Sequence, residues 1–153
     1  MRKLRVFVDT CVFGGCFDEE FEHHSKRFFE EVRDGRFEIV VSETVLAELK
    51  GAPERVKELV VELMDCMEIV APSIEIEALR DAYIEAEVVG TSSLDDAEHI
   101  AVASAVQADI VVSWNFKHIV HFDKIRGYNA INMLKGYQAI DIRSPSEVID
   151  YEK

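Results

Sequence analysis

SLDDAEHIAVASAVQADIVVSWNFKHI, residues Ser93–Ile119, is the stretch that decides the fold class. It predicts a helix that begins near Asp95, a turn just before residue 110, and the short strand Ile110–Val112. The three strand residues are β-branched and wholly apolar, which is typical of a strand covered on both faces. The apolar pattern then stops, so polar side chains follow the carboxyl end of a buried strand.

Asp96 lies in the first turn of this predicted helix. The free N–H groups and the macrodipole of a helix N-terminus stabilise a carboxylate there. At about 100° per residue, Asp96 lies in line with Ile100 and Ala103, which belong to the apolar face. An acid at the head of an apolar face indicates a polar site nearby.

The composition indicates one α/β domain with a real core. The chain has 153 residues, of which 48% are hydrophobic, and this suits a single compact domain over residues 1–153 with a polar C-terminal tail over about 144–153. No run approaches the roughly 20 apolar residues of a membrane span. Met1-Arg2-Lys3 leads directly into a strand and not into a signal-peptide core. We therefore expect a cytoplasmic protein that makes no membrane contact.

The net charge of −13 argues against broad electrostatic binding of nucleic acid, which needs Lys and Arg to neutralise phosphates. It is compatible with a nucleic-acid enzyme, because acidic residues can hold metal ions that engage the phosphate. A basic partner protein that covers the acidic surface is the alternative. The cysteines Cys11, Cys16 and Cys66 are odd in number and lack a metal-finger spacing, so we expect semi-buried free thiols.

The first strand is predicted over Lys3–Val8 and is followed by Asp9. Open α/β sheets bind ligands just outside the carboxyl ends of their strands, so Asp9 is a candidate site residue. The alternative is that Asp9 caps the following turn. The pair Gly14-Gly15 predicts a break in the chain before an amphipathic helix over Asp18–Arg33.

A second strand, Phe37–Val41, leads into a short helix that Ser42 is expected to cap. This helix carries two glutamates with different surroundings. Glu43 points about 160° from the apolar Val45, towards water, whereas Glu48 lies only about 60° from it, at the edge of the buried face. Glu48 is therefore the candidate site residue of this helix.

The other segments are predicted to pack the core. Strands that alternate with helices predict an α/β fold, namely a three-layer α/β/α sandwich with a mostly parallel central sheet. The remaining predicted elements are helices over 54–67, 74–89 and 122–134, the last interrupted or weakened at Gly127, an extended piece over 69–71 and a strand over 138–142.

Four candidate residues share chemistry that points to a metal: Asp9, Glu48, Asp96 and Asn115. Carboxylates that are brought together repel one another and take up protons unless a cation compensates them. An all-oxygen cluster without cysteine favours Mg²⁺ or Mn²⁺ over zinc. Such ions can clamp a phosphodiester and generate a hydroxide from bound water. The residues therefore point to metal-assisted phosphodiester hydrolysis.

Four motifs in order resemble those of PIN-domain ribonucleases, and within that family the VapC-like toxins of bacterial and archaeal toxin–antitoxin pairs. The resemblance runs from the first strand to about His121. The motifs are VFVDT at Val6–Thr10, SETVLAEL at Ser42–Leu49, DAEHIAVA at Asp96–Ala103 and ADIVVSWNFKHI at Ala108–Ile119.

The resemblance implies that Asp9, Glu48 and Asp96 bind the metal. Asp9 and Asp96 would be the primary ligands, and Glu48 would bind the ion directly or orient a water. Family members commonly carry a fourth acid where this chain has Asn115. Asparagine can ligate through its carbonyl oxygen or hold a metal-bound water, but it brings no negative charge, so a second ion would bind more weakly.

Residues beside these four have two interpretations each. The hydroxyls of Thr10 and Ser113 either position the acids or a phosphate, or cap strand ends. His99 is expected to be a hydrogen-bonded core histidine, with contact to a carboxylate or to substrate as the alternative. Trp114 is expected in the core, with stacking on a base as the alternative. The few nearby cations, which either contact RNA phosphates or are ordinary surface residues, are Lys50, Lys117, His118 and Lys124.

These observations predict a metal-dependent endoribonuclease that acts on RNA. The resemblance further implies the toxin component of a toxin–antitoxin pair, a cognate antitoxin partner and a homodimer. Because of Asn115 and the acidic charge, a degenerate PIN-fold module that binds RNA or a protein without cleavage is the alternative. A phosphatase with Asp9 as nucleophile is disfavoured, because Cys11 stands where such enzymes carry a second aspartate and no phosphoryl-binding loop follows.

Overall fold

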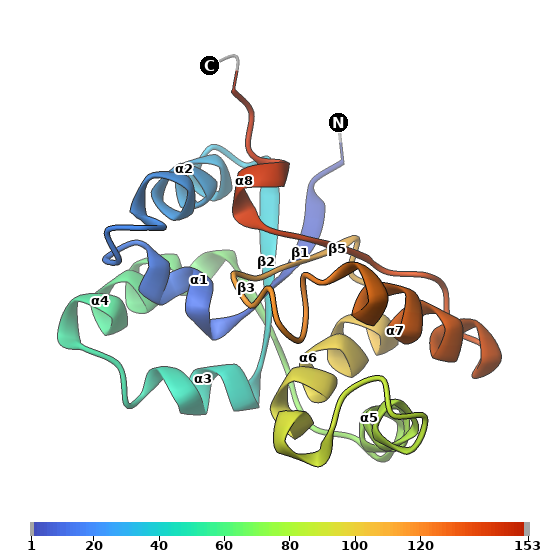
Figure 1. The fold of residues 1–153 in the computed structure, drawn as a ribbon. Helices are drawn as coiled ribbons and strands as arrows, with labels where there is room; N and C mark the ends of the chain where they lie inside the picture. Colours follow the sequence, from blue (N-terminus) through green and yellow to red (C-terminus); the bar gives the residue numbers. More distant parts are fainter. Residues whose placement is uncertain (1, 152–153) are drawn as a thin grey trace.

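The computed structural model describes residues 2–151 and contains a five-stranded sheet with helices on both faces (Figure 1). The strand order is β3-β2-β1-β4-β5, and every neighbouring pair is parallel. The predicted α/β class is confirmed, with a sheet that is entirely parallel. Met1 and the last two residues of the predicted tail, Glu152 and Lys153, lie outside the described residues.

The strands are β1 (Leu4–Val8), β2 (Phe37–Ser42), β3 (Met67–Val70), β4 (Ile110–Val112) and β5 (Asp141–Arg143). The helices are α1 (Thr10–Gly15), α2 (Glu22–Arg33), α3 (Glu43–Leu49), α4 (Glu54–Leu63), α5 (Ile74–Glu85), α6 (Leu94–Ala105), α7 (Phe122–Leu134) and α8 (Pro145–Val148). Single 3₁₀ turns at Met64–Cys66 and Thr91–Ser93 precede β3 and α6. None of the helices in residues 2–151 is long and apolar enough to cross a membrane.

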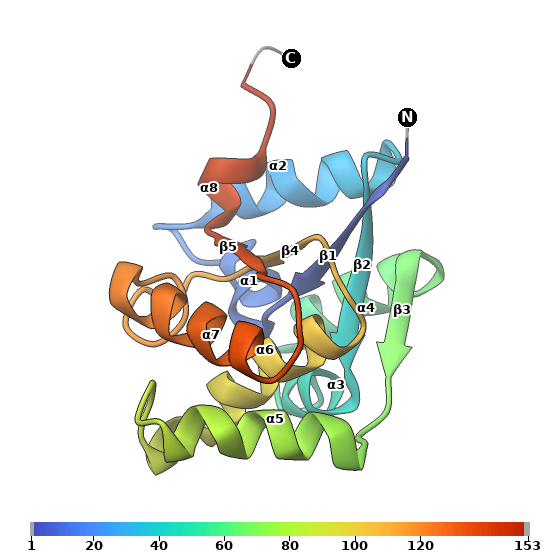
Figure 2. The same cartoon turned by 90° about the vertical axis from the view of Figure 1, so that its right-hand side faces the viewer.

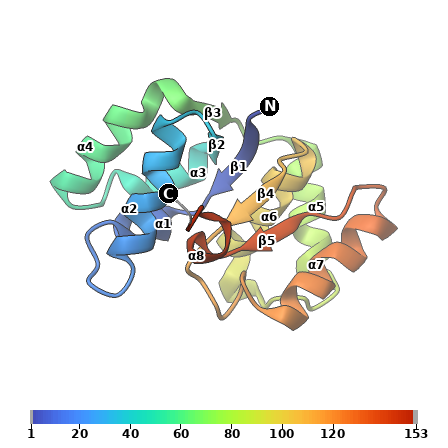
Figure 3. The ribbon, with the colours of Figure 1, turned by 90° about the horizontal axis from the view of Figure 1, so that it is seen from above.

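The sheet is covered on both faces, as its composition requires. Helices α1, α2 and α4 lie on one side, and α5, α6 and α7 lie on the other (Figures 1 and 3). Figure 2 shows α5 lying along the outside of α6. The apolar residues of the central strand, Val6, Phe7 and Val8, have no exposed surface. A parallel sheet buried on both faces needs near-continuous apolar strands, and β1 and β2 supply them.

The strand order creates a switch point between β1 and β4. After β1 the chain crosses one face of the sheet to reach β2, whereas it reaches β4 by way of α5 and α6 on the opposite face (Figure 3). Parallel strands end at the same edge, and the crevice outside their carboxyl ends at such a point is the usual ligand site of an open α/β sheet. Topology alone therefore brings Asp9 close to Ser113.

Two glycines that were predicted to interrupt the chain allow close packing. Helix α1 ends at Gly15, so the break predicted at Gly14-Gly15 comes directly after this pair. A Cβ on Gly15 would lie 2.6 Å from Ser25 Oγ, so the missing side chain lets α1 approach α2. Helix α7 is continuous through Gly127, where an interruption or weakening was predicted, and a Cβ there would lie 2.8 Å from Cγ1 of Val88.

Three helix boundaries also differ from prediction. Helix α2 begins at Glu22 because the preceding residues form a turn, in which the Glu20 N–H donates to Asp18 Oδ1 at 2.9 Å. Helix α5 ends at Glu85 because Glu87 adopts a left-handed conformation (φ 60°), with the N–H of residue 88 bonded back to the carbonyl of residue 83. Met67 leaves the predicted helix to pair with Ile39 of β2.

The C-terminal segment is tied to α2 by a buried acid. Glu31 has no exposed side-chain surface. Its carboxylate accepts hydrogen bonds from the Arg36 guanidinium and from the Asp150 backbone N–H, the latter at 2.8 Å, and lies 3.4 Å from Arg27 Nε. Pro145, Val148 and Ile149 are also buried. The segment predicted as a polar tail thus carries the one helical turn of α8 and packs against the domain.

Candidate functional site

Asp9 lies directly after β1, at the switch point, and is only 6% exposed. It occupies the N-cap position of α1, but its side chain makes no capping hydrogen bond, so the capping alternative is wrong. Its Oδ2 instead accepts a hydrogen bond from Ser113 Oγ at 2.7 Å and lies 3.5 Å from Cys11 Sγ. Asp9, which follows β1, is therefore held by Ser113, which follows the neighbouring strand β4.

The turn after β4 is built around the Asn115 amide. Asn115 Oδ1 accepts hydrogen bonds from the backbone N–H groups of Lys117 at 3.2 Å and His118 at 2.9 Å. Its Nδ2 donates to Asp96 Oδ1 at 3.2 Å, and its backbone N–H donates to Ser113 Oγ at 2.9 Å. Both lone pairs of the carbonyl oxygen are used within the turn, so in this arrangement the amide positions Asp96 and leaves no oxygen for an ion.

His99 lies between two of the candidate acids. Its ring is 2% exposed, and Nε2 is 3.4 Å from Asp9 Oδ1 and 3.6 Å from Glu48 Oε1. Its Nδ1 is buried without a hydrogen-bond partner, and the ring packs against Phe7 with centroids 5.5 Å apart. His99 is therefore a core residue, as expected, but its Nδ1 is not hydrogen-bonded, and the alternative of contact with a carboxylate applies.

Glu48 and Asp96 complete the cluster from two further helices, α3 and α6. Glu48 is 37% exposed and faces His99, whereas Glu43 on the same helix is exposed to solvent, as predicted. Burial is the main cause that raises the pKa of each carboxyl group above its ordinary value, and the charge of Asp9 raises both further. His99 opposes the shift in both cases. Acids from three separate elements thus influence one another electrostatically.

The structure brings together every site residue that the sequence singled out. Thr10 also lies here: its buried hydroxyl is near enough to lower the pKa of Glu48, but it forms no hydrogen bond of good geometry. Ser113 links Asp9 to the Asn115 turn.

Oxygen donors gather here without a preformed metal cage. Within residues 2–151, no group of three or more His, Cys, Asp or Glu side chains is arranged to hold an ion. The donor chemistry nevertheless fits a hard divalent cation, because Asp9, Glu48 and Asp96 supply carboxylate oxygens and Thr10 adds a buried hydroxyl without a partner.

Sequence reasoning missed Cys11 as a site residue and named His118 only as a nearby cation. Cys11 Sγ accepts a hydrogen bond from the Trp114 N–H at 3.2 Å, and burial raises the pKa of its thiol to about 12, so it stays protonated at neutral pH. The charge of His118 lowers the pKa of Asp96, which places this ring close to the acids. The only sequence signals were their spacings, two residues after Asp9 and three after Asn115.

Trp114 lies in the core, as expected. It is 8% exposed, its ring stacks on Phe21 with centroids 4.4 Å apart, and Nε1 donates to Ser25 Oγ at 2.8 Å. The packed rings of Trp114 and Phe21 therefore support the turn that carries Asn115. Trp114 cannot also offer a free face to a base.

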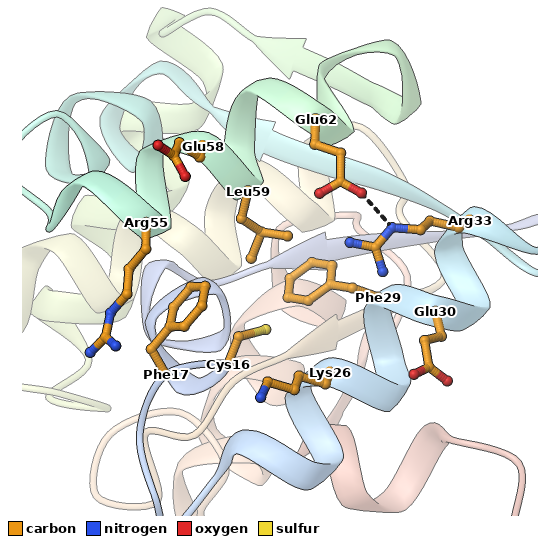
Figure 4. A pocket seen from close by; sticks show the side chains of 10 residues that line it. All are labelled: Cys16, Phe17, Lys26, Phe29, Glu30, Arg33, Arg55, Glu58, Leu59 and Glu62. Carbon is orange, nitrogen blue, oxygen red and sulfur yellow. Dashed lines mark hydrogen bonds and ion pairs between the residues drawn. The ribbon is translucent and has the colours of Figure 1, made fainter.

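A separate cleft of about 420 Å³ lies between α1, α2 and α4 and contains none of the acids described above (Figure 4). Its floor is apolar, and its rim carries both signs of charge. In Figure 4, Arg33 and Glu62 point towards one another, and they form an ion pair at 2.9 Å. The lining residues are Cys16, Phe17, Lys26, Phe29, Glu30, Arg33, Arg55, Glu58, Leu59 and Glu62.

Comparison with known proteins gives one family and two structural likenesses. Residues 5–117 match the sequence model of the family described as PIN domain. Among curated proteins, none matches this chain significantly. The chain is similar to a structure of VapBC2 from Rickettsia felis bound to a DNA fragment from their promoter (TM-score 0.58, 14% identity, 92% of this chain and 98% of that chain covered). It is also similar to a structure of FitAcB from Neisseria gonorrhoeae (TM-score 0.58, 12% identity, 94% and 99% covered). At these identities the likeness shows a shared fold.

Proposed function

Since this chain belongs to the PIN-domain family, we propose that it is a metal-dependent endoribonuclease that hydrolyses RNA phosphodiester bonds. One observation carries the proposal: three acids from distant segments approach the switch point between β1 and β4, and none of them has a Lys or Arg partner within residues 2–151. Asp9 and Asp96 are the proposed primary metal ligands, and Glu48 is the third. Partly buried acids with raised pKa values, such as Glu48 and Asp96, are typical of functional sites.

A bound Mg²⁺ or Mn²⁺ would neutralise these acids, polarise a phosphate oxygen and lower the pKa of a bound water. The protein's own residues have separate tasks. Ser113 Oγ donates to Asp9 Oδ2 and so fixes that carboxylate, while Asn115 Nδ2 does the same for Asp96 Oδ1. His99 Nε2 can hold a proton between Asp9 Oδ1 and Glu48 Oε1, which lessens their repulsion when the site is free of metal.

Cleavage of single-stranded RNA with and without Mn²⁺ tests the proposal. We expect cleavage with Mn²⁺, none with EDTA, and a loss of at least about a hundredfold in Asp9→Asn and Asp96→Asn, since even residues that only orient metal ligands cost about 10–100-fold. Glu48→Gln should also lose activity. Glu43→Gln is the matched control, because this exposed glutamate lies on the same helix. Metal-dependent cleavage that survives both aspartate substitutions would contradict the assignment.

We further propose that the protein is the cytoplasmic toxin component of a toxin–antitoxin pair, with a cognate antitoxin protein and a homodimeric state. The shared fold with VapBC2 supports this assignment. The apolar floor and mixed-charge rim of the cleft between α1, α2 and α4 suit a protein segment better than a nucleic acid (Figure 4). Co-expression with the product of the neighbouring gene should yield a stable complex with suppressed RNA cleavage, and light scattering of the free chain should give the mass of a dimer.

A second function, a PIN-fold module that binds RNA or a protein without cleavage, is favoured by the Asn115 amide and by the lack of a preformed metal cage in residues 2–151. Titration calorimetry with Mn²⁺ separates the two. Heat of binding at or below millimolar Mn²⁺ that Asp96→Asn abolishes supports the nuclease. No binding at millimolar Mn²⁺ supports the non-cleaving module.

A further inference from the structure

Phe116 is an exposed aromatic residue next to the candidate site. It directly follows Asn115, whose amide holds Asp96, and 50% of its surface is exposed. Trp114, two residues earlier, is 8% exposed. The Trp114 ring of this turn is therefore buried, and the Phe116 ring is half exposed to solvent on the turn that holds Asp96.

The turn that carries Phe116 is rigid. The Asn115 side chain accepts two backbone N–H groups, and its backbone carbonyl accepts two more, from Ile119 at 3.2 Å and Val120 at 2.8 Å. The Trp114 ring lies edge-on to Phe116 with centroids 6.2 Å apart. An exposed ring on a turn fixed in this way loses little conformational freedom when a ligand stacks on it.

The charges around Phe116 favour a polyanion, although the protein is acidic overall. Lys117 is exposed on the same turn, and neither it nor Lys124 and Arg126 at the start of α7 has a carboxylate of the described chain within 4 Å. By contrast, Arg2, Arg5 and several other cations are paired with acids. Lys117 and Lys124 are therefore available to bind phosphate, whereas the Arg126 guanidinium lies over the Phe122 ring, 5.6 Å from its centroid.

We propose that Phe116 is a base-stacking platform for single-stranded RNA, and that Lys117 contacts a phosphate of the same strand. Stacking suits this setting because every base has an aromatic face, so a single ring can hold a strand without reading its sequence. A base inside a duplex is already stacked and cannot reach the ring. The inference rests on the proposed nuclease function and assigns Phe116 as a residue that positions its substrate.

The test uses the single tryptophan of the chain as a reporter, because Trp114 lies beside Phe116. A single-stranded RNA dodecamer of mixed sequence is titrated into the Asp96→Asn protein in Mg²⁺, and Trp114 emission and the anisotropy of a labelled RNA are recorded. Phe116→Leu keeps an apolar side chain but removes the aromatic face, and about tenfold weaker binding is expected. Phe116→Tyr should bind within about twofold of the parent, and Lys117→Gln should bind more weakly with a shallower salt dependence.

Leu134→Ala is the matched control, because it removes an apolar side chain that is 75% exposed at the far end of α7. In the otherwise unmodified enzyme, Phe116→Leu should raise KM about tenfold and leave kcat unchanged, since stacking is made equally in the ground and transition states.

The outcomes separate this inference from the proposed function. RNA binding and cleavage that Phe116→Leu leaves unchanged would overturn the platform and spare the nuclease. Phe116-dependent binding by a wild-type protein that never cleaves would support the platform and contradict the nuclease. Equal binding of duplex and single-stranded RNA would also overturn the platform. Because Phe116 is exposed, an unchanged melting temperature should accompany each variant.

Discussion

Two places in this molecule bury carboxylates, and they do so in opposite ways. Glu31 on α2 has no exposed side-chain surface, and it is met by Arg27, Arg36 and the backbone N–H of residue 150. Asp9, at the switch point, is 6% exposed and faces a histidine, a serine and two further acids instead.

The difference separates an acid that joins structural elements from the acids of the proposed metal site. A buried carboxylate that is paired with guanidinium groups joins elements, here α2 and the C-terminal segment, and removing one partner leaves the others unpaired. Buried carboxylates that face one another store electrostatic repulsion, which a fold tolerates where a ligand relieves it. The same residue type therefore predicts stability in one place and metal chemistry in the other.

The largest expected effect is on the structural acid. Glu31→Gln should lower the free energy of unfolding by about 3 kcal/mol, because two guanidinium groups lose their charged partner in a buried place. Urea denaturation monitored by circular dichroism measures this. Glu30→Gln is the control, since Glu30 is 57% exposed and its pair with Arg27 should contribute less than about 1 kcal/mol. Equal effects of the two substitutions would contradict the structural role of Glu31.

A divalent metal should stabilise the protein only through the cluster of Asp9, Glu48 and Asp96. At about a hundredfold excess over its Kd, Mn²⁺ should stabilise the folded wild-type protein by roughly 2.7 kcal/mol, and EDTA should remove the gain. Glu31→Gln should keep the full gain, and Asp96→Asn should lose most of it. Melting temperatures with and without Mn²⁺ measure this. A gain that persists in Asp96→Asn would mean that the ion binds elsewhere on the acidic surface.

The smallest expected effect is that of Asp96→Asn on the free energy of unfolding, and its sign is opposite to that of Glu31→Gln. Without metal at pH 7, Asp96→Asn should raise the free energy of unfolding, by up to about 1 kcal/mol. Burial raises the pKa of Asp96 in the folded state, so its ionisation disfavours folding at pH values above that pKa. As the pH falls below the unfolded value of about 3.9, both states are protonated and the difference should vanish. Chemical denaturation at pH 7 and pH 4 tests the trend, and a destabilised variant at pH 7 would contradict it.

Helix periodicity and the positions of strand ends were sufficient to identify much of the candidate site. Asp9 and Asn115 were identified because each follows an apolar strand, and parallel strands end at one edge. Glu48 was preferred over Glu43 from the angle that each makes with Val45, and the structure exposes Glu43 and turns Glu48 towards His99. These inferences succeeded because they depend on local geometry, which helices and strands fix within a few residues.

The failures share a different cause. His99 was expected to be a hydrogen-bonded core residue, because nothing in its own helix shows that acids from β1 and α3 approach it. Gly127 was interpreted as an interruption of its helix, although its missing side chain instead admits Val88 from outside α7. Contacts between residues far apart in sequence decide such cases.

The sequence by itself determined the α/β class, the run of strands and helices, and the acids that stand where strands end, because these follow from short-range periodicity and from the chemistry of single residues. Only the tertiary structure decided the strand order, the position of His99 between two carboxylates, the binding of Asn115 to Asp96, and which buried acid has cations beside it. Those features depend on long-range packing, in which a side chain's role is set by partners that its own segment does not contain.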